Sequence, residues 1–347
     1  MNFPINRRQF IGSLAALPFA MKTVETALEA QRVAPEEAAR LRAASMSPFP
    51  VIDTHIHIFD KSRPGGMGYP RDMPGGGEPP QGHIALPNRY KLVAEPFGIV
   101  GAVIVEAATT LPDNFWLLDV AKGNPNIVGV VGRLDPNDPD FPKSLQKLAQ
   151  NKMFLGVREG GLRDGVSKPE YMSNIKRLAD ADCSLDIDTP AYALAGPGTL
   201  LKILDKVPNL RVVLDHIPGM TYRVKDYADQ QARARFVADL KELGGRPNVY
   251  AKLSEVVRVV NGTVSSELNT YKDWLDQMWD VFGEDRIMFG SDWPQSESVE
   301  YNSYPNVIGV ARAYVKTKGP AAMEKVFWKN SSKPYRWVQR EPAQKKS

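Results

Sequence analysis

Eight short runs of β-branched and other apolar residues restrict the folds that this chain can adopt. From the second run onward, successive runs begin 26 to 38 residues apart, which leaves room for a strand, a helix and two loops. Helical spacing between the runs predicts helices in 113–124, 170–182 and 271–283. Eight such units favour a (β/α)8 barrel of the α/β class over a doubly wound sheet. The runs begin at Val51, Gly101, Ile127, Phe154, Ser184, Arg211, Val249 and Ile287.

Composition places the chain among globular proteins and argues against some partners. Its 347 residues are 43% hydrophobic and 24% charged, enough to bury a large core. The 44 basic and 40 acidic residues give a formal charge of +4 and form no basic stripe, so we expect no nucleic-acid partner. The single cysteine, Cys183, cannot form an internal disulfide and is interpreted as a buried core thiol without chemistry.

The N-terminus differs from the rest of the chain. Arg7 and Arg8 precede Phe10 and the mildly apolar run 11–20, a pattern that resembles a twin-arginine export signal and predicts a periplasmic protein. The alternative is a disordered basic tail on a cytoplasmic enzyme. No segment reaches about 18 apolar residues, so we expect no stable membrane insertion after signal removal. The predicted domains are an export signal and lead-in segment (1–47), the barrel (48–337) and a polar C-terminal tail (338–347).

The interval between the first two runs is exceptional in length and composition. It spans fifty residues, and its part 61–90 is rich in Gly and Pro, which prevents a regular crossover. In a barrel this loop follows the first strand and lies on the C-terminal face, where active sites are built. We therefore predict a lid over the site, with a mobile insertion of no function as the alternative. His83 lies in this loop, either as a solvated side chain or as a ligand.

The histidines are concentrated where strands are predicted to end. In the first run, "VIDTHIHIFD", His55 and His57 alternate and so project from the same face of a strand. Two neutral imidazoles on one face suit zinc and related metals. His216 closes the sixth run in "VVLDHIPG", and Asp292 closes the eighth in "IMFGSDWP". These four side chains are the candidate metal ligands of one site, against the simpler interpretation of ordinary patterned strands.

Six motifs taken together resemble the amidohydrolase superfamily over about 49–337. They include "DTHIHIF" at the first strand, "FLGVREGG" at the fourth, "VVLDHIPG" at the sixth and "RIMFGSDWPQ" at the eighth. Within the superfamily they are similar to the amidohydrolase-2 branch, which contains sugar lactonases and 2-pyrone-4,6-dicarboxylate lactonase. The resemblance implies a TIM barrel of the metal-dependent-hydrolase type. It also implies that His55, His57 and Asp292 match the metal-site and catalytic residues, and that His216 matches the sixth-strand histidine.

One departure from the superfamily pattern limits the metal content. Many metal-dependent members carry a further histidine or a bridging lysine at the fourth or fifth strand, whereas the fifth run reads "SLDIDTP". We therefore expect one divalent metal ion, zinc or alternatively manganese, rather than a dinuclear site. Some relatives of this branch work without a metal, so a metal-independent mechanism stays open.

The same residues suggest a reaction. Hydrolysis of a lactone needs an attacking water, a base and positive charge near the developing oxyanion. Asp292 is the predicted base, with His216 as a second catalytic residue. Arg158, at the end of the fourth run, suits a substrate carboxylate. The expected substrate is a small carboxylate or lactone of a sugar acid or an aromatic-degradation intermediate, and the sequence leaves a homo-oligomer open.

Three further residues have two interpretations each. Glu106 and Lys252 either contact the substrate or complete salt bridges inside the barrel. Trp293, which follows the predicted base, either stacks on a substrate ring or packs against a loop. Two other functions also remain: a nonoxidative decarboxylase of an aromatic or related acid on the same barrel, and a non-catalytic exported binder of small molecules.

Overall fold

In the computed structural model of the protein, residues 47–347 form one compact unit. The predicted export signal, most of the predicted lid and His83 lie outside the residues that the structure describes. The described residues are 49–66, 84–159, 162, 166–188, 197–218, 229–297 and 303–345.

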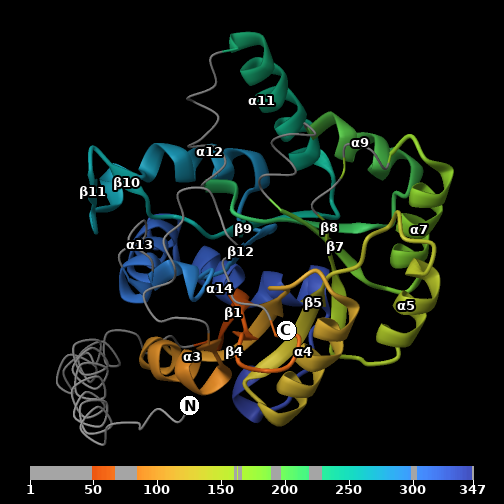
Figure 1. Ribbon diagram of the computed structural model, residues 1–347. Coiled ribbons are helices and arrows are strands. Elements are labelled where there is room, and N and C mark those ends of the chain that lie inside the picture. Colours follow the sequence, from red (N-terminus) through yellow and green to blue (C-terminus); the bar gives the residue numbers. More distant parts are fainter. Residues whose placement is uncertain are drawn as a thin grey trace, which may run out of the picture. The chain divides into compact units, whose positions relative to one another are not determined.

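A sheet of eight parallel strands forms the centre of this unit (Figure 1). Its two edge strands are the first and the last along the chain. They are joined where the backbone N–H of His57 donates to the carbonyl of Trp293 at 2.7 Å and the N–H of Asp292 donates to the carbonyl of His55 at 2.8 Å. The predicted (β/α)8 barrel is confirmed. In spatial order the strands are β1 (Val51–His57), β4 (Ile99–Val105), β5 (Ile127–Gly132), β6 (Phe154–Glu159), β7 (Ser184–Ile187), β8 (Arg211–Leu214), β9 (Val249–Leu253) and β12 (Ile287–Phe289).

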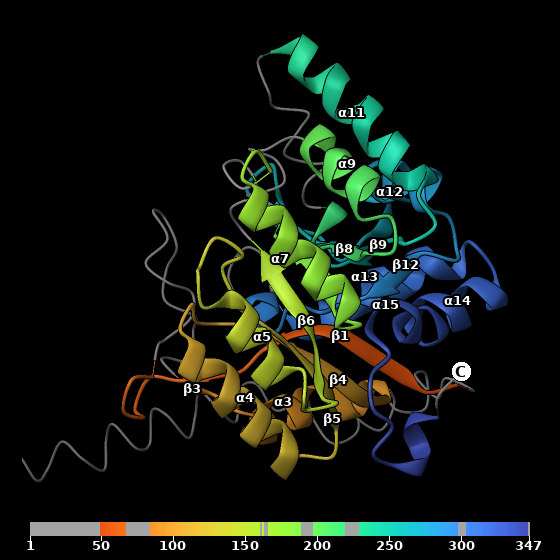
Figure 2. The same cartoon turned by 90° about the vertical axis from the view of Figure 1, so that its right-hand side faces the viewer.

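Helices lie outside the strands (Figures 1 and 2). Strands buried on both faces need continuous apolar runs rather than alternation, and this explains why the runs stand out in the sequence. None of the described helices is long and apolar enough to cross a membrane. The helices are α3 (Pro87–Ala94), α4 (Leu111–Gly123), α5 (Phe141–Leu148), α7 (Pro169–Asp180), α9 (Pro197–Lys206), α11 (Gln230–Gly245), α12 (Lys272–Phe282), α13 (Tyr304–Lys316), α14 (Pro320–Phe327) and α15 (Ser332–Tyr335).

Helix α12 shows how the helical spacing is used. Leu275, Met278 and Phe282 are buried, whereas Trp274 and Trp279 are half-buried at the edges of the same face. The two indoles therefore lie at the rim of the contact between α12 and the barrel, and the side chains of Leu275, Met278 and Phe282 form its centre.

Two short hairpins and five 3₁₀ turns complete the described chain. In the first, β2 (Phe59–Asp60) pairs antiparallel with β3 (Ile84–Ala85), which brings together the two ends of residues 61–83, the larger part of the predicted lid segment 61–90. The lid function itself remains a prediction. The second hairpin joins β10 (Val259–Val260) to β11 (Thr263–Val264). The 3₁₀ turns are η1 (Glu95–Phe97), η2 (Leu268–Thr270), η3 (Gln295–Glu297), η4 (Lys329–Ser331) and η5 (Pro342–Gln344).

The described part of the polar C-terminal tail packs against the N-terminal ends of the strands. Gln344 is fully buried, and its amide donates to the carbonyls of Val100 and Pro125 at 3.0 and 2.8 Å. Its oxygen accepts from the backbone N–H groups of Arg340 and Glu341. Because every polar group of the amide is paired, burial of this polar residue is tolerated.

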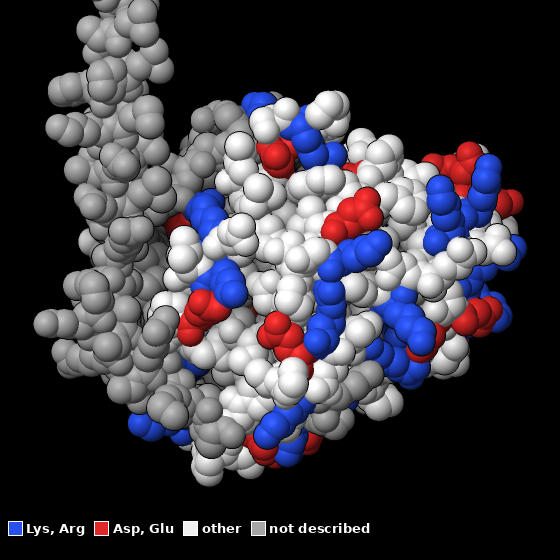
Figure 3. All heavy atoms as spheres, turned by 90° about the horizontal axis from the view of Figure 1, so that it is seen from below, with Lys and Arg blue, Asp and Glu red and all other residues white. Residues whose placement is uncertain are grey.

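The charges on the visible surface are mixed. On the face shown in Figure 3, basic and acidic side chains are interspersed over the described residues. Such a face carries no continuous basic track of the kind that follows a phosphate backbone.

Candidate active site

The two histidines of β1 lie side by side in the barrel. Their Nε2 atoms are 3.2 Å apart, and both side chains are fully buried. Residues separated by two positions in a strand project from one face, so the pair follows directly from the strand conformation of "THIHI". Both imidazoles thus present a nitrogen at one point near the C-terminal end of β1.

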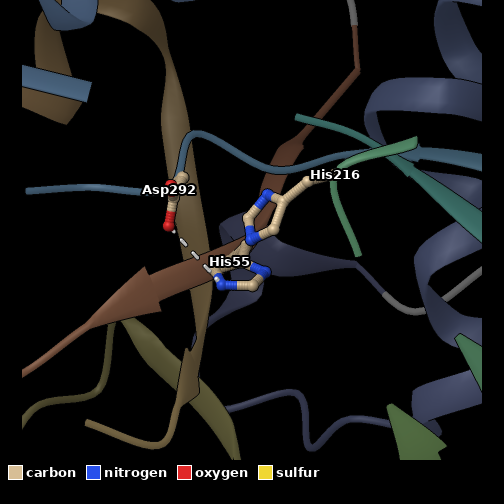
Figure 4. A group of neighbouring side chains, drawn as sticks. All are labelled: His55, His216 and Asp292. Atoms are coloured by element: carbon tan, nitrogen blue, oxygen red, sulfur yellow. Dashed lines mark ion pairs between the residues drawn. The ribbon is translucent and has the colours of Figure 1, made fainter. Parts of the chain in front are cut away.

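Asp292 and His216 reach the same point from turns that directly follow strands. Asp292 follows β12 with φ 57°, and His216 follows β8 with φ 52°. Left-handed backbone is uncommon for residues other than glycine and is often retained at functional sites. At His216 the turn interrupts the strand alternation, so that Asp215 and His216 both approach His55. Figure 4 shows the Asp292 carboxylate and the His216 ring beside His55.

The oxygen of Asp292 faces both β1 imidazoles. Its Oδ1 atom lies 3.2 Å from Nε2 of His57 and 3.6 Å from Nε2 of His55. Nδ1 of His57 lies 2.9 Å from the carbonyl oxygen of Glu106. Since a carbonyl only accepts, Nδ1 carries a proton, and in the neutral form of the ring Nε2 would turn its lone pair toward Asp292. In that form two acceptor atoms would face one another, an arrangement that a cation between them would stabilise.

At neutral pH the electrostatics of the site keep His55 and His216 uncharged and the carboxylate of Asp292 ionised. Burial, followed by the neighbouring Lys252, holds the pKa of His55 well below its usual value, and burial lowers the pKa of His216 to about 4. Burial alone would raise the pKa of Asp292, but the neighbouring imidazoles, His216 foremost, outweigh it once they are protonated at low pH, and they hold that pKa below its usual range. At neutral pH the site therefore offers uncharged nitrogen and anionic oxygen.

This donor set fits a single divalent ion. His55, His216 and Asp292 each offer one ligand atom, and the three atoms lie within 4.8 Å of one another. For zinc in tetrahedral geometry, adjacent ligand atoms are separated by about 3.3 Å. The separations of 3.2, 3.2 and 3.6 Å among His55, His57 and Asp292 are close to that value. The buried group His55, His216 and Asp292 is therefore a candidate metal site, and these separations make His57 a further candidate ligand.

Arg158 and Glu106 lie at the edge of the histidine group. The Nε and Nη2 atoms of Arg158 donate to Asp215 at 2.8 Å and Asp188 at 3.0 Å, and Nη2 lies 3.4 Å from Nε2 of His216. Its Nη1 atom is 3.7 Å from the carboxylate of Glu106. The structure therefore brings Arg158 to the site, and it pairs Glu106 with a cation, as the salt-bridge interpretation expected.

The family follows from comparison with known proteins. Residues 52–337, most of the chain, match the amidohydrolase family. The chain belongs to this family. The match includes the four candidate ligands and all eight barrel strands, apart from the first residue of β1.

Curated and solved relatives of this amidohydrolase match most of its length. It is 28% identical over 248 residues to an L-fucono-1,5-lactonase from Burkholderia ambifaria, an alignment that covers 69% of this chain and 81% of the relative. An amidohydrolase from Burkholderia multivorans, solved with bound zinc, has a TM-score of 0.66 at 22% identity, covering 83% and 99% of the two chains. A 2,6-dihydroxybenzoate decarboxylase from Rhizobium has a TM-score of 0.56 at 16% identity, covering 83% and 99%. The two solved structures support the fold.

Lys252 and Trp293 of the amidohydrolase are surrounded by other side chains of the barrel. The amine of Lys252 is fully buried and lies 2.9 Å from Asp215 and 3.1 Å from Asp186. Trp293 is also fully buried, with its ring 5.3 Å from that of Tyr90. For both residues the contacts favour the internal alternative: a salt bridge for Lys252 and packing for Trp293.

Sequence reasoning missed the polar residues that support the site of this amidohydrolase. Asp215 and Asp186 lie around Lys252, and Ser254 lies 2.9 Å from Nδ1 of His216. A carboxylate within the apolar fifth run, at Asp186, is a signal that was available in the sequence. For Asp215 the sequence signal is weaker. Asp215 and His216 are adjacent, so strand alternation predicts that their side chains point to opposite faces and that Asp215 lies outside the site.

Proposed function

We propose that this amidohydrolase opens the ring of a lactone of a sugar acid or an aromatic-degradation intermediate, with Asp292 as the base. The observation that carries the proposal is the buried carboxylate oxygen of Asp292 at 3.2 and 3.6 Å from two imidazole nitrogens. The similarity to a curated L-fucono-1,5-lactonase supports the reaction class. The zinc in a solved relative supports a metal ion as the cofactor.

The groups of the site can divide the work of hydrolysis among them. Asp292 is ionised at neutral pH because its pKa is lowered, so it can orient the attacking water and take its proton. It would then return this proton to the alkoxide that leaves when the ring opens. His216 turns a neutral imidazole toward the site, where it binds the cation or orients the substrate. A divalent ion held by His55, His57, His216 and Asp292 would polarise the lactone carbonyl and lower the pKa of a water.

Arg158 gives the proposed substrate site its charge preference. Its guanidinium lies beside His216, is almost completely buried, and is fixed by Asp215 and Asp188. Positive charge that is held in place in a dry site favours a substrate with a carboxylate or a polarised carbonyl. Fixing the guanidinium through carboxylates means that it needs little reorganisation when a substrate binds.

The test is an acid-release assay with a panel of sugar 1,4- and 1,5-lactones and 2-pyrone-4,6-dicarboxylate. The protein is purified without chelator, its metal content is measured by plasma mass spectrometry, and each lactone is assayed before and after chelation and after zinc is restored. We expect near-stoichiometric metal and hydrolysis that is lost on chelation and recovered with zinc. Hydrolysis that resists chelation would contradict the metal requirement. Carbon dioxide release from aromatic acids, without hydrolysis of any lactone, would contradict the reaction class.

A further inference from the structure

The amine of Lys252 has three polar partners in the barrel interior. Its Nζ atom lies 2.9 Å from Oδ1 of Asp215, 3.1 Å from Oδ2 of Asp186 and 3.1 Å from Nδ1 of His55. Lys252, Asp186 and His55 are fully buried, and Asp215 is 1% exposed. An ammonium has three N–H donors and no acceptor. The three partners therefore account for all the donors of Lys252.

The contact with Lys252 favours one position for the proton of His55. If Lys252 donates to Nδ1, Nδ1 must accept, and the proton of the neutral ring lies on Nε2. Nε2 of His55 then donates across 3.2 Å to Nε2 of His57. His57 is able to accept there because its own Nδ1 donates to the carbonyl of Glu106 at 2.9 Å. The hydrogen bonds thus run in one direction from Lys252 through both imidazoles to the backbone.

A metal ion requires the opposite tautomer of His55. The Nε2 atom that faces Asp292 must offer a lone pair, so the proton must move to Nδ1 and find an acceptor there. Asp215 is such an acceptor, with Oδ1 3.4 Å from Nδ1 of His55. The other oxygen of Asp215 is held by Nε of Arg158 at 2.8 Å. Nδ1 of His55 is therefore approached by a donor, the amine of Lys252, and by an acceptor, the carboxylate of Asp215.

We propose that Lys252 and Asp215 are positioning residues that select the tautomer of His55, with Lys252 favouring the metal-free state and Asp215 the metal-bound state. The inference rests on the metal site of the proposed function. The ring stays neutral throughout: Nε2 gives one proton to water, and Nδ1 takes one from water. Lys252 keeps its protons and turns its third N–H away from His55. The N–H of Lys252 must leave Nδ1 of His55 before the metal binds, so Lys252 opposes metal binding. Asp215 supports metal binding because it accepts the proton that Nδ1 then carries.

The first experiment reads the tautomers directly. Protein labelled with ¹⁵N-histidine has only four histidines, so long-range ¹H–¹⁵N spectra can be assigned with single His→Gln variants. We expect His55 to carry its proton on Nε2 without metal and on Nδ1 with one equivalent of zinc. A metal-free protein in which His55 already carries the proton on Nδ1 would overturn the proposal. This measurement uses the unaltered chain, so it does not depend on whether any variant folds.

The second experiment measures zinc affinity by competition with a chelating dye. Lys252→Met combined with Asp186→Asn removes one positive and one negative charge and leaves Asp215 paired with Arg158. We expect this double variant to bind zinc about tenfold more tightly, the lower end of the range for changes around metal ligands. Tyr335→Phe is the control, because Tyr335 donates to Asp186 without contacting His55, and it should bind like the unaltered protein. Equal affinity in the double variant would overturn the role of Lys252.

The proposed function and this inference fail in different ways. A protein that binds no zinc, but in which His55 carries its proton on Nε2, would contradict the metal-dependent function and the role of Asp215 while supporting that of Lys252. A protein that binds zinc and hydrolyses lactones, with the same His55 tautomer in both states, would keep the function and overturn the inference.

Discussion

The carboxylate of Asp53 accepts a hydrogen bond from the backbone N–H of Ser291 at 2.8 Å, and Ser291 directly precedes the proposed base, Asp292. The other oxygen of Asp53 accepts from the hydroxyls of Tyr90 at 2.8 Å and Tyr304 at 3.3 Å. Asp53 is fully buried, and burial raises its pKa. This single side chain on β1 therefore ties α3 and α13 to the turn that carries Asp292.

Removing the Asp53 carboxylate should affect both stability and catalysis. Asp53→Ala leaves several buried donors without an acceptor, at about 1–3 kcal/mol each, and loosens the turn before Asp292. We expect a clear loss of unfolding free energy in urea and a lower kcat with a nearly unchanged KM. Asp53→Asn keeps an acceptor oxygen, so its unfolding free energy and its kcat should fall less than those of Asp53→Ala. Equal kcat values for Asp53→Ala and the unaltered enzyme would show that the turn needs no such support.

Asp292→Asn should abolish turnover without changing the fold. The amide has the shape of the carboxylate but cannot accept a proton from water, and general bases contribute about 10²–10⁴-fold in rate. The measurement is kcat for the best lactone together with the thermal unfolding midpoint. Asp276→Asn, in a surface cluster with Lys272 and Lys318, is the control and should keep full activity. Activity in Asp292→Asn within threefold of the unaltered enzyme would exclude this residue as the base.

Arg158→Ala should weaken both substrate binding and the barrel interior. For carboxylate-bearing lactones we expect KM to rise about tenfold, which corresponds to ~1.4 kcal/mol. Breaking a buried ion pair costs about 3–5 kcal/mol, and the loss here should be at the lower end because Asp215 keeps Lys252. Arg133→Ala is the control, since Arg133 is more exposed and lies 3.8 Å from Glu106. An unchanged KM in Arg158→Ala would mean that this guanidinium is purely structural.

The fold could be predicted because the barrel strands are distinctive in the sequence. A strand covered on both faces needs β-branched and apolar residues at every position, so runs such as "GAVIVEA" and "IVGVVGRL" show where β4 and β5 lie. The helices α4, α7 and α12 were also expected, because each must turn one apolar face toward these strands. The length of the last strand was not evident: β12 has only three residues, Ile287–Phe289, and the chain reaches Asp292 through a turn.

The site could be predicted only as far as strand periodicity reaches. His55 and His57 follow the alternation of β1, whereas Asp215 and His216 are adjacent and yet both approach His55. The left-handed conformation of His216 makes this possible, and a single sequence has no signal for it when the residue is not glycine. The buried partners of Lys252 were missed for a related reason, because contacts between β7, β8 and β9 depend on strand register.

Cys183 should be unreactive in the native protein. The side chain is 3% exposed, and burial raises the pKa of the thiol to about 12, so almost no thiolate forms at pH 8. We expect less than one tenth of an equivalent to react with a disulfide reagent at pH 8, and one equivalent in urea. Fast labelling of the native protein would contradict the buried position.

The same thiol makes a testable contribution to the pH dependence of stability. Its pKa is higher in the folded than in the unfolded chain, so the unfolded chain loses its proton first as the pH rises. The contribution is complete below about pH 9 and is lost between about pH 9 and 12. The difference in unfolding free energy between Cys183→Ala and the unaltered protein should therefore shrink between pH 8 and pH 10.5. A constant difference would contradict the raised pKa.

Export should depend on the paired arginines near the N-terminus. The sequence predicts that Arg7 and Arg8, followed by Phe10 and an apolar run, direct the chain to the twin-arginine route. Because that route distinguishes arginine from lysine although the charge is the same, Arg7→Lys with Arg8→Lys should abolish export from a bacterial host, as measured by immunoblotting of periplasmic and cytoplasmic fractions. Arg40→Lys with Arg42→Lys changes the same residue type in the lead-in segment and should be exported normally. An unaltered chain found only in the cytoplasm would favour the alternative of a basic tail on a cytoplasmic enzyme.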